Sequence, residues 1–153
     1  MTQPQTKKPT ILFDIDGTLA DIVHRRHFLD EEKPNWHAFN DAMGDDTPNT
    51  PIVNLYKTLW DSEQYTIVIV TGRGEEHRKL TEQWLAWNEI LFDQLLMRPA
   101  KDSRADYIIK QEILDALRDQ GHEILFTVDD RQQVVDMWRR NGITCLQCDE
   151  GDF

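Results

Sequence analysis

Short apolar runs alternate along the chain with longer stretches in which apolar residues recur every three or four positions. The short runs have the length and the β-branched content of buried strands. They lie at residues 10–15 (TILFDI), 65–72 (YTIVIVTG), 93–98 (DQLLMR), 122–130 (HEILFTVDD) and 143–148 (ITCLQC). Stretches with helical spacing lie at residues 52–62, 77–91, 103–121 and 131–142. This alternation predicts an α/β fold, a three-layer Rossmann-like sandwich with a five-stranded parallel sheet in the middle.

The connection between the first two predicted strands is longer than a simple crossover needs. It contains a polar insertion at about residues 21–50, which includes most of the turn-rich sequence MGDDTPNTP. A segment of about 30 residues is too small to fold as a domain, so we expect a small cap on a single domain over residues 10–153. Residues 1–9 are expected to form a flexible tail.

The tryptophans are expected mainly in the core. Leu80, Trp84 and Trp87 recur at helical intervals, which predicts a stripe that faces the sheet. We expect Trp138 and Trp60 to be buried as well.

The composition is that of a soluble globular protein. The chain has 153 residues, of which 39% are hydrophobic and 29% are charged. It has no apolar stretch near the roughly 20 residues that cross a bilayer, and its N-terminus has two lysines but no apolar segment of a signal peptide. We therefore expect no membrane association and a cytoplasmic location.

The formal net charge of -11 argues against a broad cationic surface for duplex DNA, because each neutralised phosphate needs a Lys or Arg. It leaves open a site that binds one terminal phosphate with a local cluster of cations over a metal.

The cysteines are Cys145 and Cys148. Structural zinc usually needs four ligands, and a Cys-x-x-Cys redox motif opens a helix, whereas this pair ends a predicted strand. We expect two reduced thiols with a structural role.

Carboxylates follow two of the predicted strands. Asp14 and Asp16 come behind the first strand, and Asp129 and Asp130 end the fourth. The carboxyl ends of neighbouring parallel strands share a crevice, where four negative charges are costly without a cation. Oxygen ligands without Cys or His favour Mg²⁺.

Each motif also has a simpler interpretation. The sequence DIDG can open a calcium loop, but the Gly and Glu that such a loop requires are replaced by Leu19 and Arg25. TGRG alone is a weak phosphate-loop signal, and the DD pair alone is usually a solvated turn. It is their order on successive strands that indicates one joint site.

The ordered motifs resemble those of the haloacid dehalogenase (HAD) phosphatase superfamily. They are FDIDGTLAD, Thr71 in VTGR, Lys110, and VDDR. The sequences MRPAKDSRADYIIKQEIL and DDRQQVVDMWRRNGITCLQCDEGDF are further similar to the 3'-phosphatase domain of phage polynucleotide kinase-phosphatase. The resemblance covers nearly all of residues 10–153, except the insertion at 26–50.

The resemblance implies a role for each residue of these motifs. Asp14 would attack phosphorus to give an aspartyl phosphate, and Asp16 would protonate the leaving hydroxyl and ligate Mg²⁺ through its carbonyl oxygen. Thr71 and Lys110 would hold the phosphoryl oxygens, and Thr18 would hold Asp16.

It also implies roles for polar residues outside those motifs. Asp130 would be the metal ligand of the fourth strand, and Asp129 would either hold the ligating groups from behind or serve as the alternate ligand. Arg73 would contact phosphate, Arg25 would reach over the pocket, and Asp106 would orient Lys110 from one helical turn earlier.

Two groups of residues near these motifs each allow two interpretations. His24 and His27 could contact substrate, but exposed histidines of a helix face are the more common explanation. Trp36, His37 and Phe39 either stack a base or anchor the insertion to the core.

The expected function is a Mg²⁺-dependent phosphomonoesterase that removes a 3'-phosphate from nucleic-acid ends or nucleotides. One alternative is a 5'- or 3'-nucleotidase for free mononucleotides, and another is a non-catalytic phosphate-binding module. The phage enzyme also has a kinase domain with a P-loop, and no Gly-Lys-Ser/Thr sequence occurs here, so we expect no kinase activity. The sequence leaves the leaving group and the oligomeric state open.

Overall fold

The computed structural model describes residues 7–151, which form a parallel sheet with helices on both faces. The strand order is β5-β4-β1-β6-β7, and every neighbouring pair is parallel. The strands are β1 (Thr10–Phe13), β4 (Thr66–Gly74), β5 (Gln94–Arg98), β6 (Ile124–Arg131) and β7 (Cys145–Gly151). All five lie within or next to the predicted runs, so the predicted α/β sandwich is confirmed.

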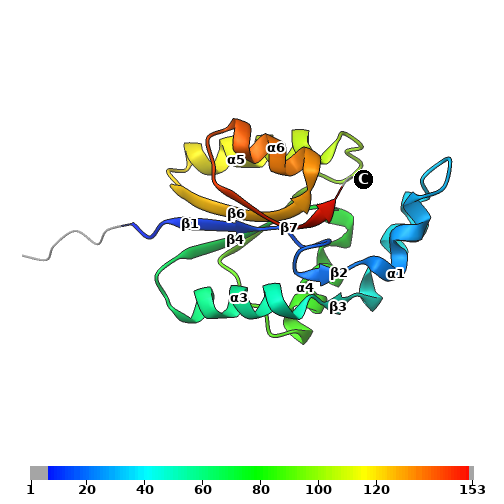
Figure 1. Cartoon of the computed structure of the whole chain (residues 1–153), viewed down its shortest axis with the longest axis horizontal. Coiled ribbons are helices and arrows are strands. Elements are labelled where there is room, and N and C mark those ends of the chain that lie inside the picture. The colour runs from blue at the N-terminus through cyan, green and yellow to red at the C-terminus, as the bar shows by residue number, and fades with distance from the viewer. Residues whose placement is uncertain (1–6, 152–153) are drawn as a thin grey trace, which may run out of the picture.

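Helices cover both faces of the sheet (Figure 1). The helices α3 (Thr50–Asp61) and α4 (Arg78–Trp87) lie on one side, and α5 (Asp106–Asp119) and α6 (Gln132–Arg140) lie on the other. Each begins and ends within a few residues of its predicted range.

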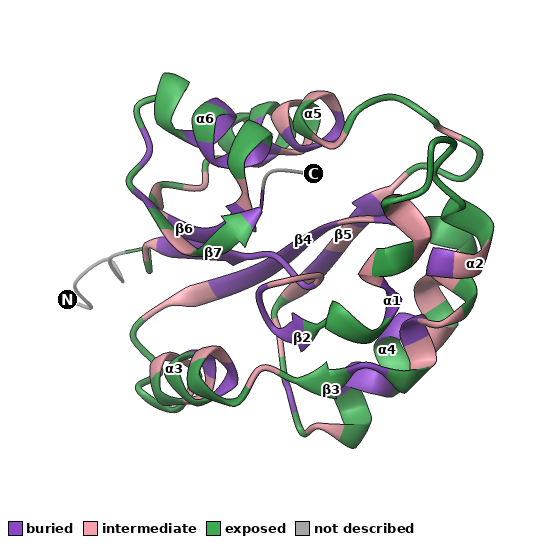
Figure 2. Cartoon of the chain, turned by 45° about the vertical axis from the view of Figure 1, so that its right-hand side comes forward, coloured by how far each residue is buried: buried purple, intermediate pink, exposed green. Residues whose placement is uncertain are grey.

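The strands are apolar at consecutive positions because the sheet is buried on both faces. Ile11 and Phe13 of β1 belong to the core beneath α3 and α4, whereas Leu12 belongs to the core beneath α5 and α6. Figure 2 shows the central strands as mostly buried between partly exposed helices.

The stripe predicted for α4 was partly wrong. Trp84 is buried, as is Trp138 of α6, but Trp87 is 66% exposed. The buried face of α4 consists of Thr81, Trp84 and Leu85. At about 100° per residue, Trp87 points roughly 110° away from the centre of that face. Trp60 is half-buried against the core.

The insertion contains short elements that the sequence did not reveal. They are β2 (Ala20–Asp21), α1 (Val23–Arg26), the 3₁₀ turn His27–Leu29, α2 (Trp36–Asp41), the 3₁₀ turn Met43–Asp45 and β3 (Thr47–Pro48). β2 and β3 pair antiparallel and close the base of the insertion. The insertion lies beside the carboxyl ends of the strands (Figure 1).

Residues 1–6 of the expected tail lie outside the described residues. Within the tail's expected range, Lys7 Nζ donates to the carbonyl of Gly121 at 2.6 Å, and the carbonyl of Pro9 accepts from the backbone N–H of Thr66 at 3.0 Å. No helix among residues 7–151 is long and apolar enough to cross a membrane.

Both cysteines are free thiols on β7. Cys145 packs under α5 and α6, whereas Cys148 contacts the core on the opposite face. Burial raises the pKa of the Cys148 thiol to about 12. These positions agree with the expected structural role.

Candidate active site

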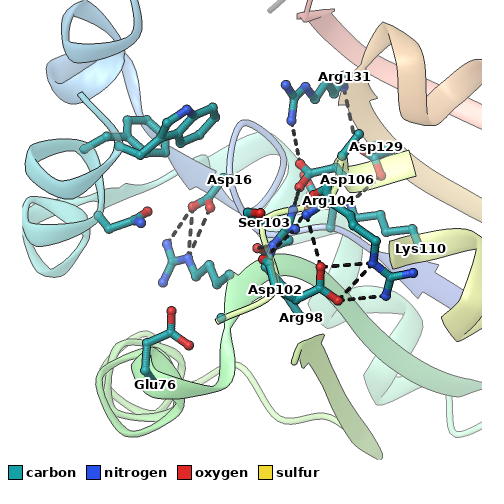
Figure 3. Close-up of a pocket in the computed structure, with 18 of the residues that line it drawn as sticks. Asp16, Glu76, Arg98, Asp102, Ser103, Arg104, Asp106, Lys110, Asp129 and Arg131 are labelled. Carbon is teal, nitrogen blue, oxygen red and sulfur yellow. Dashed lines mark hydrogen bonds and ion pairs between the residues drawn. The ribbon is translucent and has the colours of Figure 1, made fainter. Parts of the chain in front are cut away.

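The carboxyl ends of β1, β4 and β6 meet at one cavity because these strands are neighbours in the sheet. The cavity has a volume of about 380 Å³. Figure 3 shows Asp16 on one side of it and Lys110 with Asp129 on the other. The predicted meeting of strand ends is therefore present.

Three buried carboxylates form a cluster at the floor of the cavity. Asp14, Asp129 and Asp130 each place an oxygen within 4.8 Å of the other two. Lys110 Nζ lies 2.9 Å from Asp14 Oδ1 and 2.9 Å from Asp129 Oδ2. Asp129 Oδ2 also accepts from the indole N–H of Trp138 at 3.2 Å, which fixes its orientation.

The cluster carries more negative than positive charge. Burial, and after it the Asp129 carboxylate, raises the pKa of Asp14 well above its ordinary value. The same causes raise the pKa of Asp130 to about 6. Burial alone would lower the pKa of Lys110, but Asp129 and Asp14 raise it, so its ammonium group stays charged.

These residues fit a hard divalent cation. Three carboxylates face one ammonium group, so two negative charges remain when all are ionised. The donor atoms are all oxygens, which suits Mg²⁺. Asp14 and Asp130 would hold the ion, with Asp129 as a further ligand.

Thr18 occupies a different place from the one predicted. Its Oγ1 lies 3.2 Å from Asp14 Oδ2 and 3.3 Å from Asp130 Oδ1, so it braces the cluster and does not hold Asp16. Thr18 lies in the tight turn after β1, where its backbone N–H donates to the carbonyl of Ile15 at 3.0 Å.

Gly17 makes that turn possible. Its φ is +81°, and a Cβ there would lie 2.0 Å from Asp130 Oδ2. Any larger residue would be strained in its backbone and would displace a carboxylate of the cluster. Gly17 thus lets Asp130 approach the β1 turn.

Asp16 points away from the cluster toward two arginines. Its Oδ1 accepts from Arg25 Nη2 at 2.6 Å and from Arg73 Nη2 at 2.7 Å. Burial alone would raise its pKa, but Arg73 and Arg25 lower it well below the ordinary value. The side chain of Asp16 is therefore separate from the three clustered carboxylates, and metal ligation through its carbonyl oxygen stays a prediction.

The two arginines lie differently from what was predicted. Arg25 is fully buried and is absent from the described residues that line the cavity, so the prediction that it reaches over the pocket was wrong. Its guanidinium group packs 4.2 Å from the centre of the Phe39 ring. Arg73 does line the cavity, so its contact with phosphate stays a prediction.

A buried carboxylate of the insertion, Asp46, joins these arginines. Asp46 accepts from Arg25 Nε at 2.8 Å and Arg25 Nη2 at 2.7 Å, and from Arg73 Nη2 at 3.1 Å. Its carbonyl accepts from the indole N–H of Trp84 at 2.8 Å. The sequence predicted only a turn at Asp46, because partners so far apart in the chain leave no local pattern.

Thr71 and Asp106 each bind an arginine, and the contact of Thr71 with phosphoryl oxygens stays a prediction. Thr71 is buried, and its hydroxyl accepts the backbone N–H of Arg73 at 3.1 Å. The Asp106 carboxylate binds Arg98 and, at 2.7 Å, Arg131. No hydrogen bond from Asp106 to Lys110 is present among the described residues, so Asp106 acts on Lys110 only through its charge.

Arginines that the sequence did not assign line the rim. They are Arg98, Arg104 and Arg131. Arg98 donates to the carbonyl of Gly72 at 2.8 Å, and Arg104 pairs with Asp102 at 2.7 Å. Arg131 directly follows the DD pair in VDDR, a signal that could have marked it.

The insertion forms the remaining wall, where Trp36, Phe39 and Asn40 line the cavity. His24 Nε2 lies 2.7 Å from Asp46 Oδ1, so this histidine has a partner within the protein. His27 is exposed, as expected, and its ring packs 4.0 Å from that of Phe28.

Comparison with known proteins identifies relatives of this site. Residues 8–153 match the family model of the polynucleotide kinase PNKP phosphatase domain. A putative bifunctional polynucleotide kinase/RNA ligase of Autographa californica nuclear polyhedrosis virus is 27% identical over 84% of this chain and 17% of its own length.

Solved structures agree with this family match. Two structures of the Pnkp1/Rnl/Hen1 complex, one of them described as an RNA repair complex, each contain a chain 34% identical to this one, with TM-scores of 0.78 and 0.80. The matched regions cover 99% and 100% of this chain but only 46% and 50% of the chains in those two structures. A haloacid dehalogenase-like hydrolase of Streptococcus pneumoniae shares the fold, with a TM-score of 0.63 over 92% of this chain and 84% of its own, at 17% identity.

The chain thus spans half or less of these kinase-related relatives. The family model matches residues 8–153, a range that includes the site described above. The chain therefore belongs to the family of the PNKP phosphatase domain, a branch of the HAD phosphatases.

Proposed function

We propose that the protein is a Mg²⁺-dependent phosphomonoesterase that removes the 3'-phosphate from nucleic-acid ends or nucleotides. The observation that carries this proposal is the ammonium group of Lys110, held between Asp14 and Asp129 at the floor of an open cavity. The family match and the RNA repair complex of its relative favour a nucleic-acid substrate.

The proposed reaction has two steps on Asp14. In the first, a carboxylate oxygen of Asp14 attacks phosphorus, the bond from phosphorus to the 3'-oxygen breaks, and that oxygen takes a proton from Asp16. In the second, water attacks phosphorus of the aspartyl phosphate and gives a proton to Asp16, and the bond from phosphorus to the Asp14 oxygen breaks, which restores the Asp14 carboxylate and releases inorganic phosphate. Lys110 stabilises the charge on the transferred group throughout.

Bound Mg²⁺ supplies positive charge that reduces the repulsion between Asp14 and the phosphate dianion. Asp14, Asp130 and the carbonyl of Asp16 would hold it, with Asp129 as a further ligand. Thr18 keeps the Asp14 and Asp130 carboxylates in place for this purpose.

The ion pairs of Asp16 favour its ionised form, which is the form that accepts a proton from water. Its role as an acid in the first step requires that bound substrate draws Arg73 toward the phosphate and weakens the pair. Arg73 lines the cavity, which supports a contact between its guanidinium group and bound phosphate.

A mononucleotidase is the second candidate. The net charge of -11 disfavours a long tract of nucleic acid, and a cavity of about 380 Å³ suits one nucleotide. This candidate uses the same catalytic residues and differs only in the leaving group.

A parallel assay of three substrates tests the proposal. With Mg²⁺ present, phosphate release should be comparable for a 3'-phosphorylated oligonucleotide and a 3'-mononucleotide, because the terminal phosphate supplies most of the contacts. A 5'-mononucleotide should react much more slowly. Exclusive turnover of the 5'-mononucleotide would favour the second candidate, and no turnover of any of them would favour a non-catalytic module.

A further inference from the structure

The cavity extends beyond the residues that would bind phosphate. The floor contains the carboxylates and Lys110, and the insertion forms one wall above them. A phosphate group fills only part of a volume of about 380 Å³. The remaining space lies beside an aromatic surface.

The three aromatic residues of the insertion that the sequence offered for base stacking, Trp36, His37 and Phe39, have clearly different environments. Phe39 is 5% exposed and packs on the guanidinium group of Arg25, so it anchors the insertion. His37 is absent from the described lining and pairs with exposed Asp41 at 3.2 Å. Trp36 is 47% exposed and lines the cavity.

Trp36 is also held in place. Its ring meets the Phe39 ring edge to face, with centroids 5.6 Å apart and an interplanar angle of 88°. The Phe39 ring is fixed in turn by Arg25, which is fully buried. An indole that already packs against a neighbouring ring loses less conformational entropy than a free side chain when a planar group stacks on it.

We propose that Trp36 is the stacking platform for the base of the nucleotide that carries the terminal phosphate. Asn40 lies one turn further along α2, lines the same cavity, and offers its amide group to a base edge. Stacking needs no cationic surface, which suits a chain of net charge -11. This inference rests on the proposed function and specifies its substrate as a nucleotide with its base present.

The test uses two short oligonucleotides with a 3'-phosphate, one with a normal terminal nucleotide and one with an abasic terminal residue. The wild-type protein should favour the normal end by roughly tenfold in kcat/KM, the range that one stacked base supplies. Trp36→Ala should bring the ratio close to one, and Trp36→Phe should retain part of it. Trp87→Ala, which removes an exposed indole outside the cavity, should leave the ratio unchanged.

Equal rates on both ends in the wild-type protein would contradict the role of Trp36 as a stacking platform. An unchanged ratio in the Trp36→Ala variant would contradict it too. Hydrolysis of neither end would instead contradict the proposed function itself.

A second inference comes from the buried ion pairs. Asp46 is the carboxylate that binds both arginines of Asp16, and its side chain is fully buried. Arg25 and Arg73 in turn bind the same oxygen of Asp16. The geometry points to Asp46 as a positioning residue that keeps the arginines, and through them Asp16, in one orientation.

Leaving groups distinguish this role from general structural support. A 3'-mononucleotide needs a proton on its leaving oxygen, whereas p-nitrophenyl phosphate releases a stable phenolate without one. Asp46→Asn should lower kcat/KM by about tenfold or more for the mononucleotide and by less than about threefold for p-nitrophenyl phosphate. Asp45→Asn, at the exposed neighbouring position, should change neither.

Equal losses on the two substrates would show that Asp46 only supports the fold, and no loss on either would exclude any role. Asp46→Glu keeps the charge but displaces it, so it gives the same comparison if Asp46→Asn does not fold. Wild-type turnover of the mononucleotide is the reference, and its absence would count against the proposed function.

Discussion

Replacement of Asp14 by Asn should lower the rate of phosphate release by roughly a hundredfold or more while the protein stays folded. The amide group has the size of the carboxylate but is a poor nucleophile, so the covalent step is lost. Burial and Asp129 raise the pKa of the Asp14 carboxyl, which means that its ionised form is unfavourable in the folded protein. A neutral Asn at this position should therefore lower the stability of the fold only a little. The measurement is phosphate release from a 3'-phosphorylated oligonucleotide, with the melting temperature as a check of folding.

Asp119→Asn is the matched control, because Asp119 is exposed at the end of α5 and should leave the rate unchanged. Near-normal turnover by the Asp14→Asn variant would show that Asp14 is not the nucleophile, whatever the substrate.

Removal of divalent cations should abolish nearly all activity. The three clustered carboxylates face a single ammonium group, so without a cation the phosphate dianion meets excess negative charge. EDTA should reduce phosphate release to background, and added Mg²⁺ should restore it. Ca²⁺ should support much less turnover because its coordination is larger and looser.

Binding can be measured apart from catalysis. Mg²⁺ should raise the melting temperature of the wild-type protein, since a ligand that binds only the folded state stabilises it. Asp130→Asn should weaken this shift, and Asp119→Asn should not. Full activity in EDTA, or a melting temperature that Mg²⁺ leaves unchanged, would contradict the carboxylate metal site.

The fold was predictable because its signals are local. Ile11, Leu12 and Phe13 are apolar at consecutive positions, as a strand covered on both faces must be. The parallel order of strands then brings their carboxyl ends together, so the sequence alone predicted that Asp14 lies near Asp129 and Asp130.

The partners of the polar side chains were less predictable because they depend on packing between distant segments. Arg25 was expected to reach over the pocket, but its guanidinium group packs on the Phe39 ring and pairs with the buried Asp46 carboxylate. Asp106 was expected to orient Lys110, but its carboxylate forms ion pairs with Arg98 and Arg131. Neither arrangement leaves a periodic pattern in the sequence.

The position of the phosphate on the substrate is the central claim, and a single oligonucleotide with a phosphate at both ends tests it most directly. Incubated with the wild-type protein and Mg²⁺ and followed by mass spectrometry, this oligonucleotide should lose its 3'-phosphate and keep its 5'-phosphate. Loss of the 5'-phosphate first, or survival of both phosphates, would contradict the account.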